Sequence, residues 1–249
     1  MHCFDWTYAQ IKEELPNIAA AGFSAVQTSP AHPREPVGAA WYMLYQPYDY
    51  KVGENGLGTK EGLTELCTEA HQYGVKIIVD VVANHTNGSL SYVASFWQDK
   101  SLYHDYQGGI DYSNRWQVTH GRLGMWDLKT EDSRVQEKIK EYVAELKSCG
   151  VDGIRWDAAK HIGLPSEGDT FWQNVPDQTM YNYGEILDGT GGDDTVSEKV
   201  EVVSQTTGVQ LHPVAGESSA KAMIYNLQGQ RVDANYHGVV VCNGRKYVQ

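Results

Sequence analysis

An amphipathic helix, a glycine and a short apolar strand recur in that order along the chain, and this repeat constrains the fold more than any other feature. The first unit has a helix at about residues 8–21 with one apolar face, and Gly22 follows as its C-cap. Buried strands are expected at 23–30, 75–82, 151–157 and, more weakly, 180–187. Strands that alternate with helices predict an α/β fold with a parallel sheet.

The composition excludes several classes of function. A net charge of −12 argues against nucleic acid and anionic membranes as partners. No apolar run is long enough for a transmembrane helix, and no signal peptide opens the chain. A strand is expected to be under way at the first residues, so whether Met1 is the native start is left open. The cysteines, which show no C-x-x-C spacing, favour buried free thiols over a zinc site, with one disulfide left open: Cys3, Cys67, Cys149 and Cys242.

The strand at 151–157 ends in charged residues rather than apolar ones. Arg155 and Asp157 are two residues apart, so on a strand both side chains point to the same face. We expect the Arg155 guanidinium to keep Asp157 ionised by lowering the pKa of its carboxyl group. An ionised, positioned carboxylate suits covalent catalysis at a sugar carbon. Taken alone, the pair is more typical of a structural ion pair at the edge of a sheet than of a catalytic site.

Two other strands of the same predicted sheet also end in acids. Asp80 ends one of them, and Glu185 lies in the last. Each acid alone is typical of a strand-end cap or a solvated carboxylate. Together with Asp157 they place three carboxylates at neighbouring strand ends, and like charges crowded there are costly unless they are used. The set therefore indicates a functional site.

These strand ends carry longer motifs that resemble a known family. DVVANH (80–85), GIRWDAAKH (153–161) and GEILDG (184–189) are similar to signature regions of the α-amylase family of glycoside hydrolases. The segment that begins WYMLYQPYDY, at residue 41, resembles the bacterial saccharifying α-amylases in particular. The resemblance extends from about residue 2 to about residue 194.

The resemblance implies retaining endo-hydrolysis of α-1,4-glucosidic bonds in starch and related glucans. Asp157 matches the nucleophile of the family, and Glu185 matches its general acid/base. The residues that match the sugar-binding and supporting positions are Arg155, Asp80, His85, Tyr45, Trp41, Tyr42, Gln46 and Lys160. Ordinary loop packing is the alternative for the aromatic residues among them.

A bound calcium ion is also implied by the resemblance. The matching ligands are the Asn84 side chain, the Asp127 carboxylate, and the main-chain carbonyl groups of Thr119 and His161. Calcium takes several oxygen ligands of these kinds. Without the resemblance, Asn84 is typical of a turn and Asp127 of a cap before the helix expected near Ser133.

The resemblance also implies an incomplete (β/α) barrel of the TIM type, because a full barrel alone usually takes about 250 residues. We expect barrel units at residues 1–83 and 128–195, a loop domain inserted after the third strand at 84–127, and a small C-terminal β segment at 196–249. An open sheet exposes strand edges. Self-association into a homo-oligomer, or capping by the C-terminal strands, is therefore a hypothesis for this chain.

The chain departs from the family pattern after Glu185. The family has a third catalytic Asp, preceded by His, and no His-Asp pair follows Glu185 in this sequence. This leaves two other hypotheses open: a starch-binding protein with little or no turnover, and an unstable fragment. The last 30 or so residues resemble the sorting segments by which some Gram-negative bacteria export proteins, which implies a secreted or cell-surface location.

Overall fold

The structure is a computed structural model that divides into two units, Met1–Thr207 and Gly208–Gln249. It describes residues 1–34, 40–106, 108–187, 224–226, 231–232, 239–242 and 245–248.

The first unit is built on a parallel sheet whose strands run in the order β1-β2-β3-β6-β7. This confirms the predicted α/β class and the parallel sheet. The strands and helices of this unit are β1 (His2–Cys3), α1 (Tyr8–Ala20), β2 (Ala25–Thr28), α2 (Lys60–Gln72), β3 (Lys76–Val82), β4 (His85–Thr86), α3 (Arg115–His120), β5 (Trp126–Asp127), α4 (Ser133–Ser148), β6 (Gly153–Asp157), α5 (Phe171–Asn174) and β7 (Tyr181–Gly184). Short 3₁₀ helices lie between them: η1 (Trp41–Tyr45), η2 (Ser95–Gln98), η3 (Lys100–Leu102), η4 (Ala159–His161) and η5 (Pro165–Glu167).

Local sequence explains where the long helices begin and end. The side chains of Thr7, Thr59 and Asp132 accept hydrogen bonds from the first turns of α1, α2 and α4. Beyond each C-terminus a glycine adopts a positive φ that other residues reach only at a cost: Gly22, Gly74 and Gly150, with φ of 83°, 70° and 92°. The predicted glycine stops are therefore confirmed, one residue beyond the cap itself.

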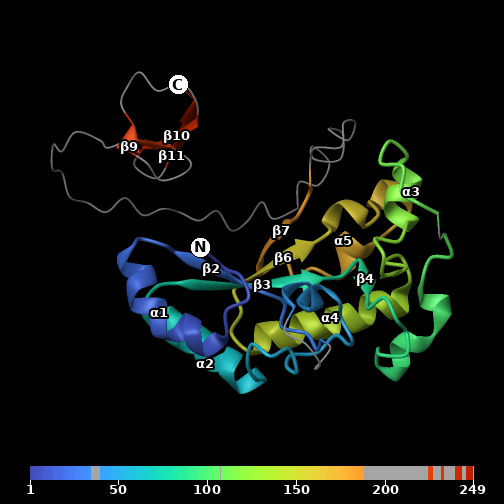
Figure 1. Ribbon diagram of the computed structural model, residues 1–249, viewed down its shortest axis with the longest axis horizontal. Helices are drawn as coiled ribbons and strands as arrows, with labels where there is room; N and C mark the ends of the chain where they lie inside the picture. Colours follow the sequence, from blue (N-terminus) through green and yellow to red (C-terminus); the bar gives the residue numbers. More distant parts are fainter. Residues whose placement is uncertain are drawn as a thin grey trace. The chain divides into compact units, whose positions relative to one another are not determined.

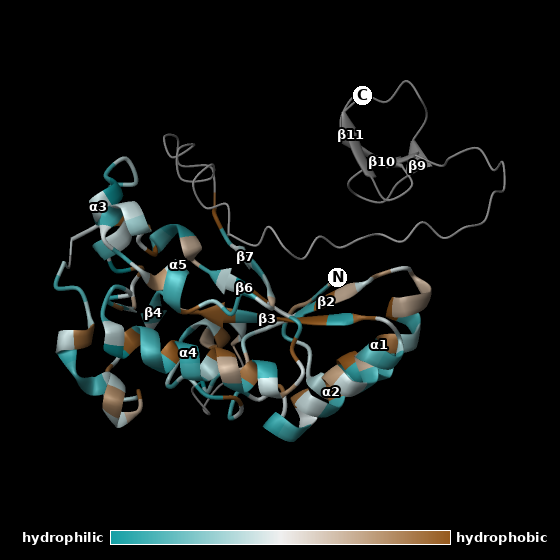
Figure 2. Ribbon diagram, turned by 180° about the vertical axis from the view of Figure 1, so that it is seen from behind, coloured by the Kyte–Doolittle hydropathy of each residue, from teal (hydrophilic) through white to brown (hydrophobic). Residues whose placement is uncertain are grey.

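The three long helices lie on one face of the sheet. α1, α2 and α4 lie together on one side of the strands (Figure 1). Their apolar faces and the central strands form the hydrophobic core, which shows as brown segments in Figure 2. Ile154 and Trp156 of β6 are fully buried in this core. Because side chains alternate along a strand, Arg155 points to the opposite face.

The segment from 84 to 127 has no sequence period, yet it contains regular elements. β4 and β5 pair antiparallel, with His85 opposite Asp127 and Thr86 opposite Trp126. The short helix α3 and the 3₁₀ helices η2 and η3 lie between these strands. None of these pieces is longer than six residues, and a periodic pattern needs a longer window to be recognised.

The second unit contains an antiparallel sheet with strand order β11-β10-β8-β9. The strands are β8 (Ile224–Asn226), β9 (Arg231–Val232), β10 (Val239–Cys242) and β11 (Arg245–Val248). They fall within the small C-terminal β segment expected at 196–249. Throughout the described residues, no helix combines the length and apolar character that crossing a bilayer requires.

Candidate active site

Three carboxylates from neighbouring strands surround one guanidinium group. Arg155 Nη1 lies 2.7 and 2.8 Å from the two carboxylate oxygens of Asp80, and 2.8 Å from Asp157 Oδ1. Arg155 Nη2 forms an ion pair with Glu185 Oε1. The acids come from β3, from the end of β6 and from the residue after β7. The predicted gathering of acids at adjacent strand ends is therefore present in the structure.

Strand register brings these side chains together. Asp80 stands opposite Arg155 in the pairing of β3 with β6, and Val82 stands opposite Asp157. Glu185 is fixed by its own backbone, which donates a hydrogen bond to Trp156 O at 2.8 Å. A one-residue slip of any strand would move its acid to the helix-covered face. The pairing register of β3 with β6 and the backbone bond of Glu185 therefore set the geometry of the cluster.

Burial changes the expected protonation of Asp157. Its side chain is only 12% exposed, and burial together with the charges of Asp80 and Glu185 raises the pKa of Asp157 to about 7. Arg155 does act to lower this pKa, as predicted from the sequence, but burial and the two other acids outweigh it. The direction of the Arg155 effect is therefore confirmed, whereas the expectation that it keeps the net pKa of Asp157 low is wrong. Near neutral pH the cluster can hold a proton.

Asp80 and His85 lie deeper than Asp157. Asp80 is fully buried, and burial raises its pKa to about 6 against the pull of Arg155. Tyr45 Oη donates a hydrogen bond to Asp80 Oδ2 at 2.9 Å. Burial lowers the pKa of His85 to about 4, so its ring is neutral, and His85 Nε2 lies 3.0 Å from Tyr45 O. Tyr45 is thus linked to both residues.

A pocket of about 470 Å³ opens over this cluster. The site residues expected from the sequence that line it are Trp41, Tyr45, His85, Arg155, Asp157, Lys160, His161 and Glu185. Asp80 is not part of the lining, and Tyr42 and Gln46 are not either. Tyr42 is 49% exposed, and Gln46 Oε1 accepts a hydrogen bond from Asn87 at 3.1 Å. The pocket combines aromatic surfaces with two carboxylates, which suits a polar ligand with apolar ring faces.

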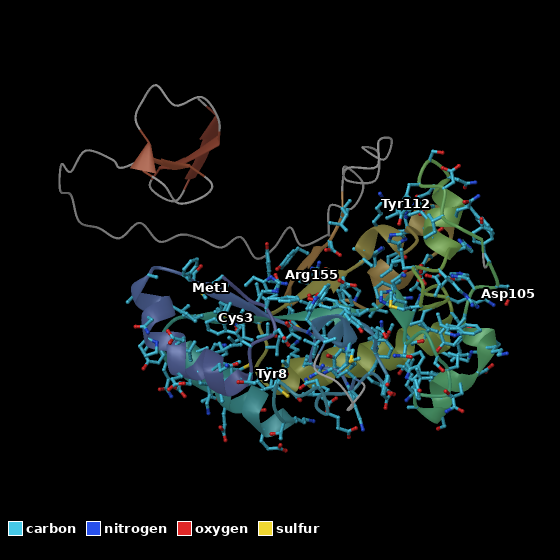
Figure 3. All side chains as sticks on the ribbon, in the orientation of Figure 1. Met1, Cys3, Tyr8, Asp105, Tyr112 and Arg155 are labelled. Carbon is cyan, nitrogen blue, oxygen red and sulfur yellow. The ribbon has the colours of Figure 1, made fainter. Side chains whose placement is uncertain are left out.

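Other lining residues were not predicted from the sequence. They are His2, Phe4, Tyr112, Leu123, Met125, Ala158 and Leu187. Phe4 stacks on Tyr45 with ring centroids 6.4 Å apart and an interplanar angle of 18°. Tyr112 belongs to the inserted segment, whereas Arg155 belongs to the sheet (Figure 3). An aromatic residue in a loop after a strand end is the signal that could have identified Tyr112.

Two of the expected calcium ligands are in direct contact, and the segments that carry the other two are linked by a neighbouring contact. The Asn84 side-chain amide is 3.0 Å from Asp127 Oδ1. His161 Nδ1 is 2.8 Å from the carbonyl oxygen of Val118, the residue before Thr119. Oxygen atoms of an amide, a carboxylate and two main-chain carbonyls form a donor set that fits calcium. Among the described residues, no three or more His, Cys, Asp or Glu side chains are grouped as a metal site of their own.

His104 contacts the carboxylate oxygen of Asp127 that Asn84 does not contact. Its Nδ1 lies 2.7 Å from Asp127 Oδ2, and its Nε2 lies 3.1 Å from Glu131 Oε1. Burial acts to lower the pKa of His104, but the hydrogen bonds to these two carboxylates outweigh it and raise the pKa to about 9. The alternative role for Asp127, a helix cap, is wrong because Asp132 caps α4.

The raised pKa values predict how stability depends on pH. In the unfolded chain these acids ionise near pH 4, whereas in the folded chain Asp80 and Asp157 ionise near pH 6 and 7. The folded state therefore binds more protons between pH 4 and 7, and its stability falls as the pH rises through this range. We expect Asp157→Asn to remove on the order of 3 kcal/mol of this fall. Urea unfolding at a series of pH values tests it, and parallel curves for the two proteins would contradict it.

The chain is similar to known proteins over most of its length. The family model described as alpha amylase, catalytic domain, matches residues 7–238. The α-amylase of Clostridium acetobutylicum is 40% identical over 208 residues, which cover 75% of this chain and 27% of that protein. The α-amylase of Butyrivibrio fibrisolvens is 31% identical over 231 residues, covering 76% of this chain and 24% of the relative. The chain thus spans about a quarter of the length of these relatives.

Solved structures share the fold. The α-amylase of Malbranchea cinnamomea is 30% identical with a TM-score of 0.63, and the match covers 74% of this chain and 41% of that one.

Proposed function

Because the chain belongs to the α-amylase family, we propose that it hydrolyses α-1,4-glucosidic bonds within starch and related glucans. The observation that carries this proposal is the cluster of Asp80, Asp157 and Glu185 around Arg155 at the base of the pocket. Carboxylates at the C-terminal ends of neighbouring parallel strands are where (β/α) barrels carry out catalysis.

The proposed reaction retains the configuration at the sugar carbon. Asp157 attacks the anomeric carbon while Glu185 donates a proton to the departing glycosidic oxygen, which leaves a glycosyl group esterified to Asp157. Glu185 then takes a proton from water, and the resulting oxygen nucleophile releases the sugar from Asp157. The first step needs an ionised Asp157 and a protonated Glu185, and the second needs an ionised Glu185 while Asp157 is esterified. Arg155 contacts Asp157 and favours its ionised form against the effect of burial, so with a pKa of about 7 a substantial share of Asp157 is ionised near neutral pH.

The pocket surroundings support a glucan as the ligand. Trp41 is 54% exposed at the pocket edge and offers a ring face, while Tyr45 lies deeper, bonded to Asp80. We assign sugar contacts to Trp41, Tyr45, His85 and Lys160, all of which line the pocket. Aromatic faces bind the apolar side of a sugar ring, and the charged groups bind its hydroxyls.

We also propose a calcium ion held by Asn84, Asp127 and the carbonyl groups of Thr119 and His161. When bound, the ion would supply a link between the inserted segment and the segment after β6. At a calcium concentration about 100-fold above Kd, we expect thermal unfolding to shift upward by roughly 5–10 °C. A chelator is expected to remove this shift and to lower the release of reducing ends from soluble starch.

A matched pair of variants tests the calcium site. Asn84→Ala is expected to abolish the calcium shift. Asn17→Ala, at an exposed residue of α1 whose side-chain amide donates to Glu14, is expected to keep it. Equal calcium shifts in the two variants would show that the ion binds elsewhere. Failure of the unmodified protein to release reducing ends from starch would contradict the hydrolase itself.

A second candidate function is starch binding with little or no turnover. The observation that favours it is that no His-Asp pair follows Glu185 in this sequence. Loss of a group that acts only in the transition state lowers turnover and leaves binding intact. Starch binding without release of reducing ends would select this function.

Two further expectations remain proposals. We propose export to the cell surface or the medium, on the resemblance of the C-terminal residues to sorting segments. We also propose that a second copy covers the edges of the sheet at β1 and β7, since edge strands present unpaired N–H and C=O groups.

A further inference from the structure

The segment that follows β6 adopts a conformation that its neighbours must hold in place. Ala158, directly after Asp157, lies in the left-handed region with φ 50° and ψ 31°. A residue with a Cβ atom adopts this region at a cost and persists there only when its surroundings fix it. The segment then forms η4, which carries Lys160, and continues to η5.

One end of this segment is fixed by the residue after β7. The backbone N–H of Ala158 donates to Glu185 Oε2 at 3.2 Å, and the N–H of Lys160 donates to Glu185 O at 3.4 Å. These bonds hold the start of the segment against the sheet. They do not involve the carbonyl groups of Lys160 and Ile162.

The other end is fixed by Arg115, the first residue of α3 in the inserted segment. Its Nη1 donates to Lys160 O, and its Nη2 donates to Ile162 O at 3.0 Å. The same guanidinium binds Glu167 on η5, with Nε 2.9 Å from Oε1 and Nη2 3.0 Å from Oε2. One side chain therefore holds two carbonyl groups of the segment and a carboxylate further along it.

Only arginine has the donors for this arrangement. Its planar guanidinium carries five N–H groups in a fixed arrangement. The four contacts of Arg115 bind two carbonyl groups and, at the same time, the carboxylate of Glu167. A lysine would bring a single ammonium group on a flexible stem and could not span both carbonyl groups and Glu167. The contact is therefore specific in geometry as well as in charge.

Lys160 connects this contact to the pocket. The Lys160 side chain lines the pocket, the residue is only 4% exposed, and its Nζ lies 5.0 Å from the ring centroid of Tyr112. Its Nζ also donates to Leu187 O at 3.4 Å. A long side chain reaches a fixed point only if its backbone is fixed. Arg115 bonds directly to the carbonyl group of Lys160, so it controls where the ammonium group can lie.

We propose that Arg115 is a positioning residue, which sets the Lys160 ammonium group at the pocket wall by holding the carbonyl groups of Lys160 and Ile162. The inference rests on the proposed function, because it assigns Lys160 to glucan binding. Arg115 itself is not part of the pocket lining among the described residues and acts through Lys160.

A double-mutant cycle tests this coupling. Binding of maltoheptaose to the full-length chain is measured by calorimetry, with Asp157→Asn present in every protein so that the ligand is not consumed. Arg115→Ala and Lys160→Ala are each expected to weaken binding by about tenfold or more. If Arg115 acts through Lys160, the double variant binds within about twofold of the weaker single variant. A purely structural role would instead multiply the two losses and overturn the inference.

Arg134→Ala is the matched control. Arg134 is 49% exposed on α4, and its ion pairs are with Asp132 and Asp99, away from the pocket lining. We expect it to leave maltoheptaose binding unchanged. Equal binding by the Arg115→Ala and Arg134→Ala proteins, or unchanged binding by Lys160→Ala, would overturn the inference while leaving the proposed function in place.

Two further outcomes must be told apart: an Arg115→Ala protein that does not fold, and a parent protein that does not bind maltoheptaose. If Arg115→Ala does not fold, Arg115→Lys carries the same test, because it keeps the charge and the aliphatic stem but lacks the planar guanidinium. Binding by Arg115→Lys at the parent affinity would overturn the inference. If the parent protein does not bind maltoheptaose at all, the proposed function fails and this inference fails with it.

Discussion

Hydrolysis of soluble starch is expected to fall by about four orders of magnitude or more when Asp157 is replaced by Asn. Asn keeps the size of the side chain and a hydrogen bond with Arg155, but it cannot form the glycosyl ester. Binding of maltoheptaose is expected to change by less than about tenfold, because the aromatic lining is untouched. Release of reducing ends and calorimetric binding, measured on the same protein, separate the two effects.

Replacing Glu185 by Gln is expected to reduce starch hydrolysis by about 10²–10⁴-fold, since Gln cannot donate the proton to the leaving oxygen. The same variant is expected to cleave an α-glucosyl fluoride much better than starch, because fluoride departs without a proton. Arg134→Ala serves as the control and is expected to keep full activity.

For the Asp157 prediction, starch hydrolysis by the Asp157→Asn protein within tenfold of the rate of the unmodified chain would rule out Asp157 as the nucleophile.

The free energy of unfolding is expected to fall by about 3–5 kcal/mol when Arg155 is replaced by Leu. Arg155 is the cation shared by Asp80, Asp157 and Glu185, of which the first is fully buried. Without it, buried carboxylates must either remain unpaired or bind protons. Urea unfolding at pH 7 measures the loss.

Two comparisons make this result specific. At pH 5 the loss is expected to shrink, because Asp80 and Asp157 are then protonated in the folded state. Arg134→Leu, on the exposed surface, is expected to change stability by less than about 0.5 kcal/mol. Similar losses in the two leucine variants, or a loss at pH 5 equal to that at pH 7, would contradict the role given to Arg155.

Local sequence patterns were enough to predict the sheet and the gathering of the acids. Gly22, Gly74 and Gly150 mark helix ends because the backbone there has a positive φ, whatever the rest of the fold does. Arg155 and Asp157 share a face because strand side chains alternate. Both rules act over a few residues, so a sequence contains all that they need.

The rest depends on contacts between distant segments. The lowering effect of Arg155 on the pKa of Asp157 was predicted, but the larger raising effects were not, because burial and the nearby Asp80 and Glu185 exist only in the folded chain. Arg115 lies 45 residues from Lys160, and no spacing rule joins them. His104 likewise finds Asp127 only through the folding of an aperiodic segment. The sequence resemblance assigned roles to single residues, whereas these partners appear only in the structure.

The covalent step on Asp157 can be observed directly. The Glu185→Gln protein is incubated with α-maltotriosyl fluoride, then examined by intact mass spectrometry and peptide mapping. The fluoride leaves without acid catalysis, and the missing base slows release of the sugar, so a maltotriosyl adduct is expected to accumulate on the peptide that contains Asp157. The Asp157→Asn/Glu185→Gln protein is expected to show none. An adduct on another residue, or fluoride release at an equal rate by both proteins, would contradict Asp157 as the catalytic nucleophile.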